Sequence, residues 1–381
     1  MPKVKLGDIA KERREVYKGD KSSCPVVGLE HLVPGEIRLS AWNVGGDNTF
    51  SKAFFAGDVL FGRRRAYLKK AAQATVDGVC SGDITVIQAR ADRVSPDLLP
   101  FIIQNDAFFE FAVKNSAGSL SPRVKWEHLA NYEINLSPMN EQRNLADLLW
   151  AAYDLKESYQ RLLNASDEMA KSRFIEMFGD PVENPMQWPK ARFIDAVADD
   201  CKLSYGIVKT GDNQTNGVPV FRPVDFTDGK IPKREDLKMT TAAISNAYKR
   251  TVLKGRELLI TIRGSVGETF IAGPEFRGCN VARNIVPIRV DEHKITLFFL
   301  QELLRTNSIQ EIIRTMTKGV ALQGINVEEM REINLILPPL PIQNEFVAFV
   351  RHLDKSKVEL LRCIADTDSM IKGLQNQMHR G

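Results

Sequence analysis

The chain has 381 residues, of which 43% are hydrophobic and 26% are charged. This length is too large for one ordinary core and predicts two domains with connecting elements. The sequence has no apolar run long enough to cross a bilayer, and residues 1–16 lack the apolar segment of an export signal. The five cysteines are odd in number, widely separated and contain no CxxC pair, which argues against a disulfide framework and a thiolate zinc site. We therefore expect a cytoplasmic protein without membrane association.

The charge balance says little about partners. The 52 basic and 48 acidic residues give a net charge of +4. A well-mixed surface of this kind permits nucleic-acid binding but does not indicate it.

The chain contains an internal duplication with a period of about 200 residues. Residues Glu133–Leu136 recur as Glu332–Leu335, an offset of 199 (332 − 133). Gly57–Arg63 resembles Gly255–Arg263, and Ala117-Gly118 aligns with Lys318-Gly319. Because these matches keep the same order, we predict two copies of one module.

Within each copy the first part is predicted to be mixed α/β. Residues 83–87 and 284–288 are short apolar runs between turn residues, which is typical of strands. Residues 97–114 and 295–316 have helical periodicity.

A long helix is predicted to end each copy. Ser137-Pro138 supplies an N-cap and a first-turn proline, and Gly179–Pro181 supplies a stop. Apolar residues alternate at gaps of three and four in both helices, which is typical of a heptad seam. At about 1.5 Å per residue, some 40 residues span roughly 60 Å. The predicted seams comprise Leu145, Leu148, Ala152, Leu155, Tyr159, Leu162, Ser166 and Met169 in the first helix, and Phe346, Val350, Leu353, Lys357, Leu360, Ile364, Thr367, Ile371, Leu374 and Met378 in the second.

Such a seam must be covered, either by the helix's own domain or by the other helix. The second alternative gives an antiparallel coiled coil, because the intervening domain must return the chain to its starting end. We therefore predict an α+β fold in which two similar mixed α/β domains are separated by two long helices, with a pseudo-two-fold internal repeat. The expected boundaries are 1–137 and 182–337 for the domains, and 138–181 and 338–381 for the helices.

Catalytic motifs are missing from the sequence. It has no phosphate-binding P-loop, no dinucleotide-binding glycine motif and no nucleophile elbow. The five histidines are isolated, and Asn184-Pro185 is not followed by the Pro-aromatic pair with which amino-methyltransferases hold a flipped base. We expect a scaffold that binds rather than an enzyme, with no metal or cofactor of its own.

The first copy carries a basic run, Arg63-Arg64-Arg65 followed by Tyr67, Lys69 and Lys70. Cations neutralise DNA phosphates, and arginine can also bridge O6 and N7 of guanine. The alternative is a solvated turn. The corresponding stretch of the second copy offers Arg263 and Ser265 beside glycines that allow close approach to a phosphate.

A second candidate loop precedes each repeated Glu-Ile-Asn-Leu segment. It offers hydrogen-bonding side chains suited to base edges, although a plain connection between elements is the alternative. Lys249 and Arg283 are further basic candidates. The candidate side chains in the two loops are Ser119, Arg123 and Lys125 in the first copy, and Lys318, Gln323 and Asn326 in the second.

The chain resembles the specificity subunits of type I restriction-modification enzymes. Arg173–Pro181, continuing to Asn184-Pro185 and Trp188-Pro189, is similar to that family's junction between the central helix and the second recognition domain. Ser137–Gln142 and Leu337–Gln343 resemble its two helix-entry motifs, except that Ile342 stands where glutamate usually precedes glutamine. Residues 57–61 and 78–81 resemble strands of its target-recognition domains.

The resemblance implies a non-catalytic subunit that binds double-stranded DNA. Each target-recognition domain would read one half of a bipartite site, and differing loops imply different half-sites. The paired helices would set the spacer and dock two modification subunits, which bring S-adenosylmethionine and methylate adenine. Restriction subunits that use ATP and magnesium would join them.

Two other functions remain open on the sequence. The first is a stand-alone nuclease or methyltransferase, which cofactor binding or cleavage by the chain alone would indicate. The second is a coiled-coil adaptor that binds only protein, which a failure to bind DNA would indicate.

Overall fold

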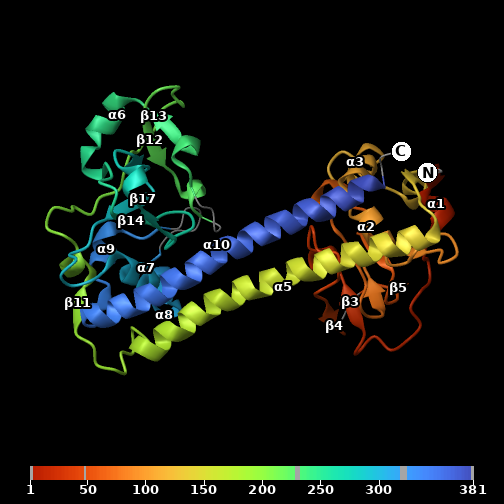
Figure 1. The fold of residues 1–381 in the computed structure, drawn as a ribbon, viewed down its shortest axis with the longest axis horizontal. Coiled ribbons are helices and arrows are strands. Elements are labelled where there is room, and N and C mark those ends of the chain that lie inside the picture. The colour runs from red at the N-terminus through yellow and green to blue at the C-terminus, as the bar shows by residue number, and fades with distance from the viewer. Residues whose placement is uncertain (1–2, 47–48, 228–231, 318–323, 379–381) are drawn as a thin grey trace. The chain divides into compact units, whose positions relative to one another are not determined.

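The computed structural model describes residues 3–46, 49–227, 232–317 and 324–378 (Figure 1). The chain divides into two compact units. Unit 1 comprises residues 1–162 and 359–381, and unit 2 comprises residues 163–358. Both units mix helices with small sheets.

Unit 1 contains two four-stranded sheets and one strand pair. The first sheet has the order β2-β9-β6-β7 and is antiparallel throughout. The second has the order β4-β3-β8-β5, in which β3 and β8 are parallel. β1 pairs with β10. The strands are β1 (Lys3–Lys5), β2 (Ala10–Glu12), β3 (Pro25–Val27), β4 (Asn43–Val44), β5 (Lys52–Phe54), β6 (Val59–Gly62), β7 (Ala71–Gln73), β8 (Gly78–Cys80), β9 (Ile84–Ala89) and β10 (Glu133–Asn135).

Unit 2 contains two three-stranded sheets and one strand pair. The orders are β15-β14-β17, which is antiparallel, and β13-β12-β16, in which β12 and β16 are parallel. β11 pairs with β18. The strands are β11 (Lys190–Arg192), β12 (Val218–Phe221), β13 (Lys238–Thr240), β14 (Glu257–Thr261), β15 (Thr269–Ala272), β16 (Asn280–Val281), β17 (Ile285–Ile288) and β18 (Asn334–Ile336).

The central strands of the two units share a pairing register. In unit 1, β6 pairs with β9 from Val59 opposite Ile87 to Gly62 opposite Ile84. In unit 2, β14 pairs with β17 from Leu258 opposite Ile288 to Thr261 opposite Ile285. Every partner on β14 lies 199 positions after its counterpart (258 − 59), and every partner on β17 lies 201 after its own (288 − 87).

Short helices cover the sheets. Each helical stretch predicted from the sequence is broken in two, at Asn105 and at Thr306. Asn105 starts the second helix of its pair, since its side chain accepts a hydrogen bond from the Ala107 amide at 2.8 Å. The short α-helices are α1 (Leu6–Ile9), α2 (Leu99–Ile103), α3 (Asp106–Lys114) and α4 (Trp126–Leu129) in unit 1, and α6 (Ala242–Ala247), α7 (Leu297–Arg305), α8 (Asn307–Met316) and α9 (Val327–Arg331) in unit 2.

Two long helices follow the mixed regions. α5 spans Met139–Phe178 and α10 spans Leu340–Gln377. A buried glutamine holds the first turn of each: Gln142 accepts from the Ser95 amide at 2.9 Å and donates to the Ser137 carbonyl at 2.8 Å. Gln343 accepts from the Thr296 amide at 2.9 Å and donates to the Pro338 carbonyl at 2.7 Å. The helix-entry motifs therefore tie each helix to the preceding domain.

The predicted seam of α10 is correct and that of α5 is partly wrong. All ten predicted positions, nine in α10 and Met378 directly after it, are buried or half-buried. In α5, Leu148, Leu155, Leu162 and Met169 are 44–55% exposed, and Leu149, Lys156, Leu163 and Ala170 face inward instead. α5 carries two apolar stripes one residue apart, and the gap pattern alone does not decide which one packs within the chain.

Within each unit, the long helices contribute to the core and side chains of the two helices also contact each other. The core of unit 1 contains Leu149 and Tyr153 from α5 and Ile371 from α10. Within that unit, Lys156 of α5 pairs with Asp368 of α10 at 2.6 Å. Within unit 2, the core contains Phe174 and Phe346, which lie edge to face at a centroid distance of 5.4 Å.

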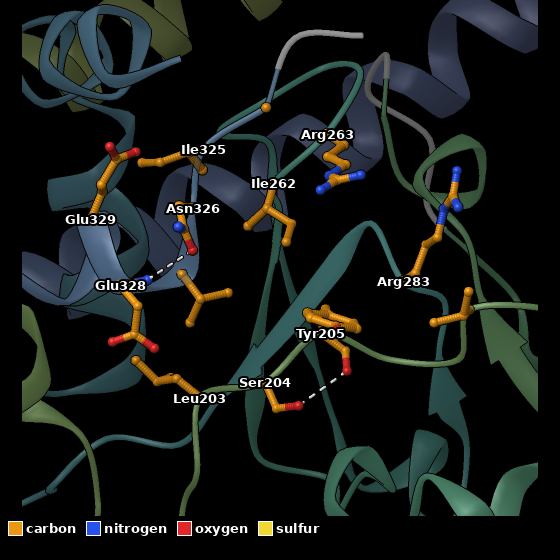
Figure 2. Close-up of a pocket in the computed structure, with 13 residues that line it drawn as sticks. Leu203, Ser204, Tyr205, Ile262, Arg263, Arg283, Ile325, Asn326, Glu328 and Glu329 are labelled. Carbon is orange, nitrogen blue, oxygen red and sulfur yellow. Dashed lines mark hydrogen bonds between the residues drawn. The ribbon is translucent and has the colours of Figure 1, made fainter. Parts of the chain in front are cut away.

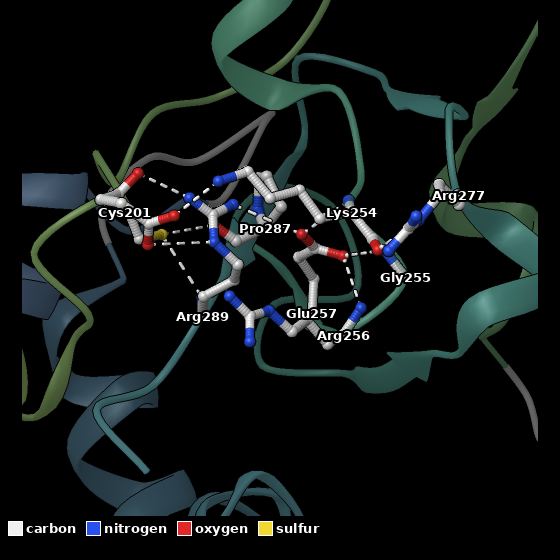
Figure 3. Close-up of polar contacts among 9 residues, drawn as sticks. Cys201, Lys254, Gly255, Arg256, Glu257, Arg277, Pro287 and Arg289 are labelled. Atoms are coloured by element: carbon white, nitrogen blue, oxygen red, sulfur yellow. Dashed lines mark hydrogen bonds and ion pairs between the residues drawn. The ribbon is translucent and has the colours of Figure 1, made fainter. Parts of the chain in front are cut away.

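Unit 2 also buries an ion pair. Arg289 and Glu257 are 7% and 1% exposed, and their side chains approach to 3.3 Å (Figure 3). Glu257 accepts hydrogen bonds from the amides of the turn before β14, including Lys254 at 2.8 Å and Gly255 at 2.9 Å. Arg289 also donates to the Asp200 carbonyl at 2.6 Å. The pair therefore fastens the turn, strand β17 and residue 200 together.

No helix within the described ranges is both long enough and apolar enough to cross a membrane.

Candidate nucleic-acid interface

Unit 2 has a cleft of about 740 Å³ beside the end of β14 (Figure 2). Three side chains predicted from the sequence line it: Arg263, Arg283 and Asn326. Arg263 follows β14, Arg283 follows β16, and Asn326 precedes α9. The structure thus brings together residues that are up to 63 positions apart (326 − 263) in the sequence.

The two arginines of the cleft are available to a ligand. Both are exposed, and neither guanidinium has an ion pair or hydrogen bond within the described residues. Asn326 caps α9, since its Oδ1 accepts from the Glu328 amide at 3.3 Å, while its amide nitrogen remains a donor. Glu328 and Glu329 also line the cleft, so its charge is mixed.

Tyr205 is a cleft residue that the sequence reasoning missed. It is 51% exposed and lies between Leu203 and Val208, which also line the cleft. The following Gly206 allows a close backbone approach, because an added Cβ would lie 1.9 Å from the Val281 carbonyl oxygen. The only sequence signal for this residue was a tyrosine that precedes a glycine, and many ordinary turns contain the same combination.

Unit 1 has a cleft of about 570 Å³ at the end of β6. Arg63 and Lys125, both predicted, line it together with Lys52 and Trp126. The Nε of Arg63 is buried without a hydrogen-bond partner among the described residues. Glu12, Glu15 and Glu127 also line the cleft, and Arg14 is paired with two of them, Glu12 and Glu127.

Arg64 and Arg123 meet at a carboxylate. Asp83 accepts from Nε of Arg123 at 2.8 Å and from Nη1 of Arg64 at 3.5 Å. Hydrogen bonding from Arg123 lowers the pKa of Asp83 below its ordinary value. Both arginines are partly exposed, so the pair is fixed and still accessible.

The remaining residues of the basic run differ in whether their side chains have a partner. Arg65 and Tyr67 are exposed, and no side-chain partner is present for either within the described ranges. Lys69 forms an ion pair with Asp106, and Lys70 donates to the Leu29 carbonyl at 2.6 Å. Lys70 therefore contributes to the internal structure of unit 1.

Other predicted residues lie apart from the clefts. Ser119 and Lys249 are exposed, and Ser265 lies in the exposed turn after β14. Lys318 and Gln323 fall outside the described residues. Nor does the described part of the chain contain a cluster of three or more His, Cys, Asp or Glu that could hold a metal ion.

A protein-family comparison matches the second half of the chain. Residues 205–366, which include the whole course from Tyr205 to Asn326 around the cleft, match the family described as type I restriction modification DNA specificity domain. The recognition of a type I specificity subunit from the sequence is thereby confirmed.

The chain is similar to two curated proteins that are named as type I specificity subunits. It is 23% identical over 312 residues to the type I restriction enzyme EcoBI specificity subunit of Escherichia coli. That alignment covers 73% of this chain and 65% of the relative, so the chain spans slightly less than two thirds of it. A second relative, the EcoDI specificity subunit of Escherichia coli, is 22% identical over 142 residues, or 35% of this chain and 31% of the relative.

Solved structures share the fold of this chain. The S subunit of a type I restriction-modification system from M. genitalium matches with a TM-score of 0.60 at 12% identity, over 99% of this chain and 95% of the other. A chain from a study of assembly and conformational transition of a type I R-M system matches with a TM-score of 0.57 at 20% identity, over 100% and 97%. At these identities the likeness establishes the two-domain α+β fold.

Proposed function

We propose that the chain is the DNA-recognition subunit of a type I restriction-modification complex and catalyses no reaction itself. The observation that carries the proposal is that the matched region contains a cleft with two exposed arginines, Arg263 and Arg283, whose guanidiniums have no ion pair or hydrogen bond among the described residues. Guanidinium groups serve both tasks that DNA recognition requires, neutralising phosphates and bridging the acceptors of guanine.

We infer that each unit contains one DNA-recognition site and that the chain is a pseudo-two-fold repeat. The shared register of β6 with β9 and of β14 with β17 supports this. The two clefts support it as well, because one lies at the end of β6 in unit 1 and the other at the end of β14 in unit 2. Domains 1–137 and 182–337 would then each bind one half of a bipartite site. Because the cleft residues differ, the two half-sites would differ as well.

The long helices would form an antiparallel coiled coil that sets the spacer between half-sites. Within unit 2, Asp167 pairs with Lys357 at 2.7 Å and Arg173 pairs with Glu345 at 3.2 Å. The partner numbers run in opposite directions along α5 and α10, as antiparallel helices require. Lys156 and Asp368 continue the same order in unit 1.

The exposed stripe of α5 is the surface we assign to the modification subunits. Leu148, Leu155, Leu162 and Met169 recur every seven residues and are 44–55% exposed. An apolar stripe of this spacing suits the apolar face of a partner helix. Two modification subunits would bring S-adenosylmethionine, and restriction subunits would bring ATP and magnesium chemistry. The complex would act on DNA in the cytoplasm.

Selection of duplexes from a random library by the purified complex with its modification subunit tests the proposal. Enrichment of two defined half-sites at a fixed separation is expected. If no duplex is enriched while the complex assembles, the alternative of a protein adaptor that does not bind DNA is favoured.

A further inference from the structure

Three loops of unit 1 meet at the end of β6. The Arg63 amide donates to the Asp83 carbonyl at 3.0 Å, and the Val124 amide donates to the Arg63 carbonyl at 3.0 Å. The Arg65 amide donates to the Pro122 carbonyl at 2.8 Å, and Arg64 and Arg123 lie opposite each other in an antiparallel bridge. Main-chain hydrogen bonds therefore fix the two arginines relative to Asp83.

One carboxylate holds both guanidiniums in this cluster. Asp83 accepts from Arg123 through Nε at 2.8 Å and Nη2 at 3.4 Å, and from Nη1 of Arg64 at 3.5 Å. Nε of Arg64 also donates to the Ser121 hydroxyl at 2.6 Å. The side chains of Arg64 and Arg123 are 39% and 44% exposed, and that of Asp83 is 21% exposed. The carboxylate is thus the more enclosed member.

The arginines keep donors for a ligand. A guanidinium has five N–H donors in a planar fork. Arg123 uses one N–H of Nε and one of Nη2 on Asp83, so both hydrogens of Nη1 and the second of Nη2 remain. These lie along the end of the fork, the edge that can donate to O6 and N7 of guanine together. Because the side chain is already ordered by Asp83, less conformational entropy is lost when the base binds.

Unit 2 has the same main-chain arrangement with different side chains. The Ile262 amide donates to the Asn284 carbonyl at 2.8 Å, the Ile325 amide donates to the Ile262 carbonyl at 3.0 Å, and Arg263 lies opposite Gly324. By register, Asn284 stands at the place of Asp83, Arg263 at that of Arg64 and Gly324 at that of Arg123.

The replacements in unit 2 remove the carboxylate that holds the arginines in unit 1. Asn284 is neutral, and its Oδ1 is buried without a hydrogen-bond partner among the described residues. At position 324 an added Cβ would lie 2.9 Å from Cγ of Arg263, so Arg263 already occupies that space. Unit 2 therefore presents one arginine that no carboxylate among the described residues holds, whereas unit 1 presents two arginines held by one acid.

We propose that Arg64 and Arg123, held by Asp83, read guanine in the half-site bound by unit 1. Asp83 is the positioning residue that confers this specificity. The inference rests on the proposed function. An acid near the DNA backbone repels phosphates, so Asp83 weakens binding to unrelated DNA while it orients the arginines for the correct base.

The test uses the chain in complex with its modification subunit and compares Asp83→Asn with wild type. Asparagine is the residue that unit 2 has at this place. Binding is measured on the selected site and on duplexes with single changes in each half-site. We expect preference for a G·C pair in one half-site to fall about tenfold or more, with the other half-site unaffected and binding to unrelated DNA unchanged or stronger.

Two sets of variants complete the test. Asp106→Asn removes the same charge from unit 1 at the Lys69 pair and should leave the preference unchanged. Arg64→Lys and Arg123→Lys keep the charge and Asp83 but lose the planar fork, and should relax the same G·C position with little change in salt dependence. If Asp83→Asn does not fold, these two lysine variants test the inference in its place.

The results separate the inference from the proposed function. Wild-type binding to a bipartite site establishes the proposed function independently of any variant. The inference is overturned if, with that binding intact, the variants reduce affinity for all duplexes equally. It is also overturned if neither half-site contains a G·C pair that depends on Arg64 and Arg123.

Discussion

Glu257 and Arg289 form an ion pair in which both side chains lie almost completely inside unit 2. Unit 1 has a related pair at the same point of its central strand. There Asp58, 4% exposed, accepts from Nε of Arg13 at 2.8 Å. The acid occupies the start of β6 or β14 in both units, but the arginine comes from different segments, residue 13 in one and residue 289 in the other. The carboxylate at the turn is therefore the shared feature.

Glu257→Gln should destabilise unit 2 by about 3 kcal/mol, because a buried arginine loses its closest carboxylate. Native-state hydrogen exchange of the β14 and β17 amides measures this. Asp195→Asn, which breaks the half-exposed pair with Arg192 at 3.0 Å, should destabilise unit 2 much less, because solvent screens an exposed pair. Equal effects of the two variants would show that burial of the Glu257 pair has no energetic consequence.

Arg263→Ala with Arg283→Ala should weaken DNA binding and reduce the slope of log affinity against log salt by about one to two, since each phosphate contact contributes about 0.9. Arg256→Ala is the matched control. Arg256 precedes β14 and Arg263 follows it, which separates them by about 20 Å of extended chain. A salt slope that changes as much for Arg256→Ala as for the pair would place the DNA elsewhere on unit 2.

Leu155→Glu with Leu162→Glu should abolish copurification with the modification subunit while leaving the thermal stability of the isolated chain nearly unchanged. Both leucines are about half exposed in the chain alone, so the new charges meet water until a partner must cover them. Gln160→Glu with Asn164→Glu adds the same charge to exposed polar positions of α5 and should assemble normally. Normal assembly of the leucine variant would remove this stripe from the docking surface.

Insertion of one heptad into each long helix should lengthen the spacer without changing either half-site. The insertions belong between Lys156 and Asp167 in α5 and between Lys357 and Asp368 in α10, so that the interhelical pairs on both sides are kept. Seven residues add about 10 Å of helix, equivalent to about three base pairs. Library selection reads the new spacing. A stable, assembled variant with the wild-type spacing would contradict the role of the helices.

Much of the fold could be predicted from the sequence because the signals were local. Ser137-Pro138 and Gly179 bound the first long helix, which runs from Met139 to Phe178. The seam of α10 was also correct, since Phe346, Val350 and Ile371 are buried and the seam's other apolar positions are buried or half-buried. The error in α5 has a physical reason. Leu148 and Leu149 both belong to plausible stripes, and only the tertiary structure shows which one packs within the chain.

The candidate site was less predictable because it depends on side-chain pairing. The basic run was visible, but its charges are partly neutralised by Asp83 and Asp106, which lie 19 and 37 positions from their partners. Tyr205 enters its cleft only because Gly206 packs against Val281. Such contacts between distant segments leave no periodic pattern in the sequence.

In the proposed function, this chain directs methylation to a bipartite DNA site. Sequencing the methylome of cells that carry the chain with its modification subunit tests it most directly. We predict methylated adenines in two different half-sites separated by a spacer of fixed length and free sequence. Methylation at a continuous motif, or a pattern that does not change when this chain is removed, would contradict the account.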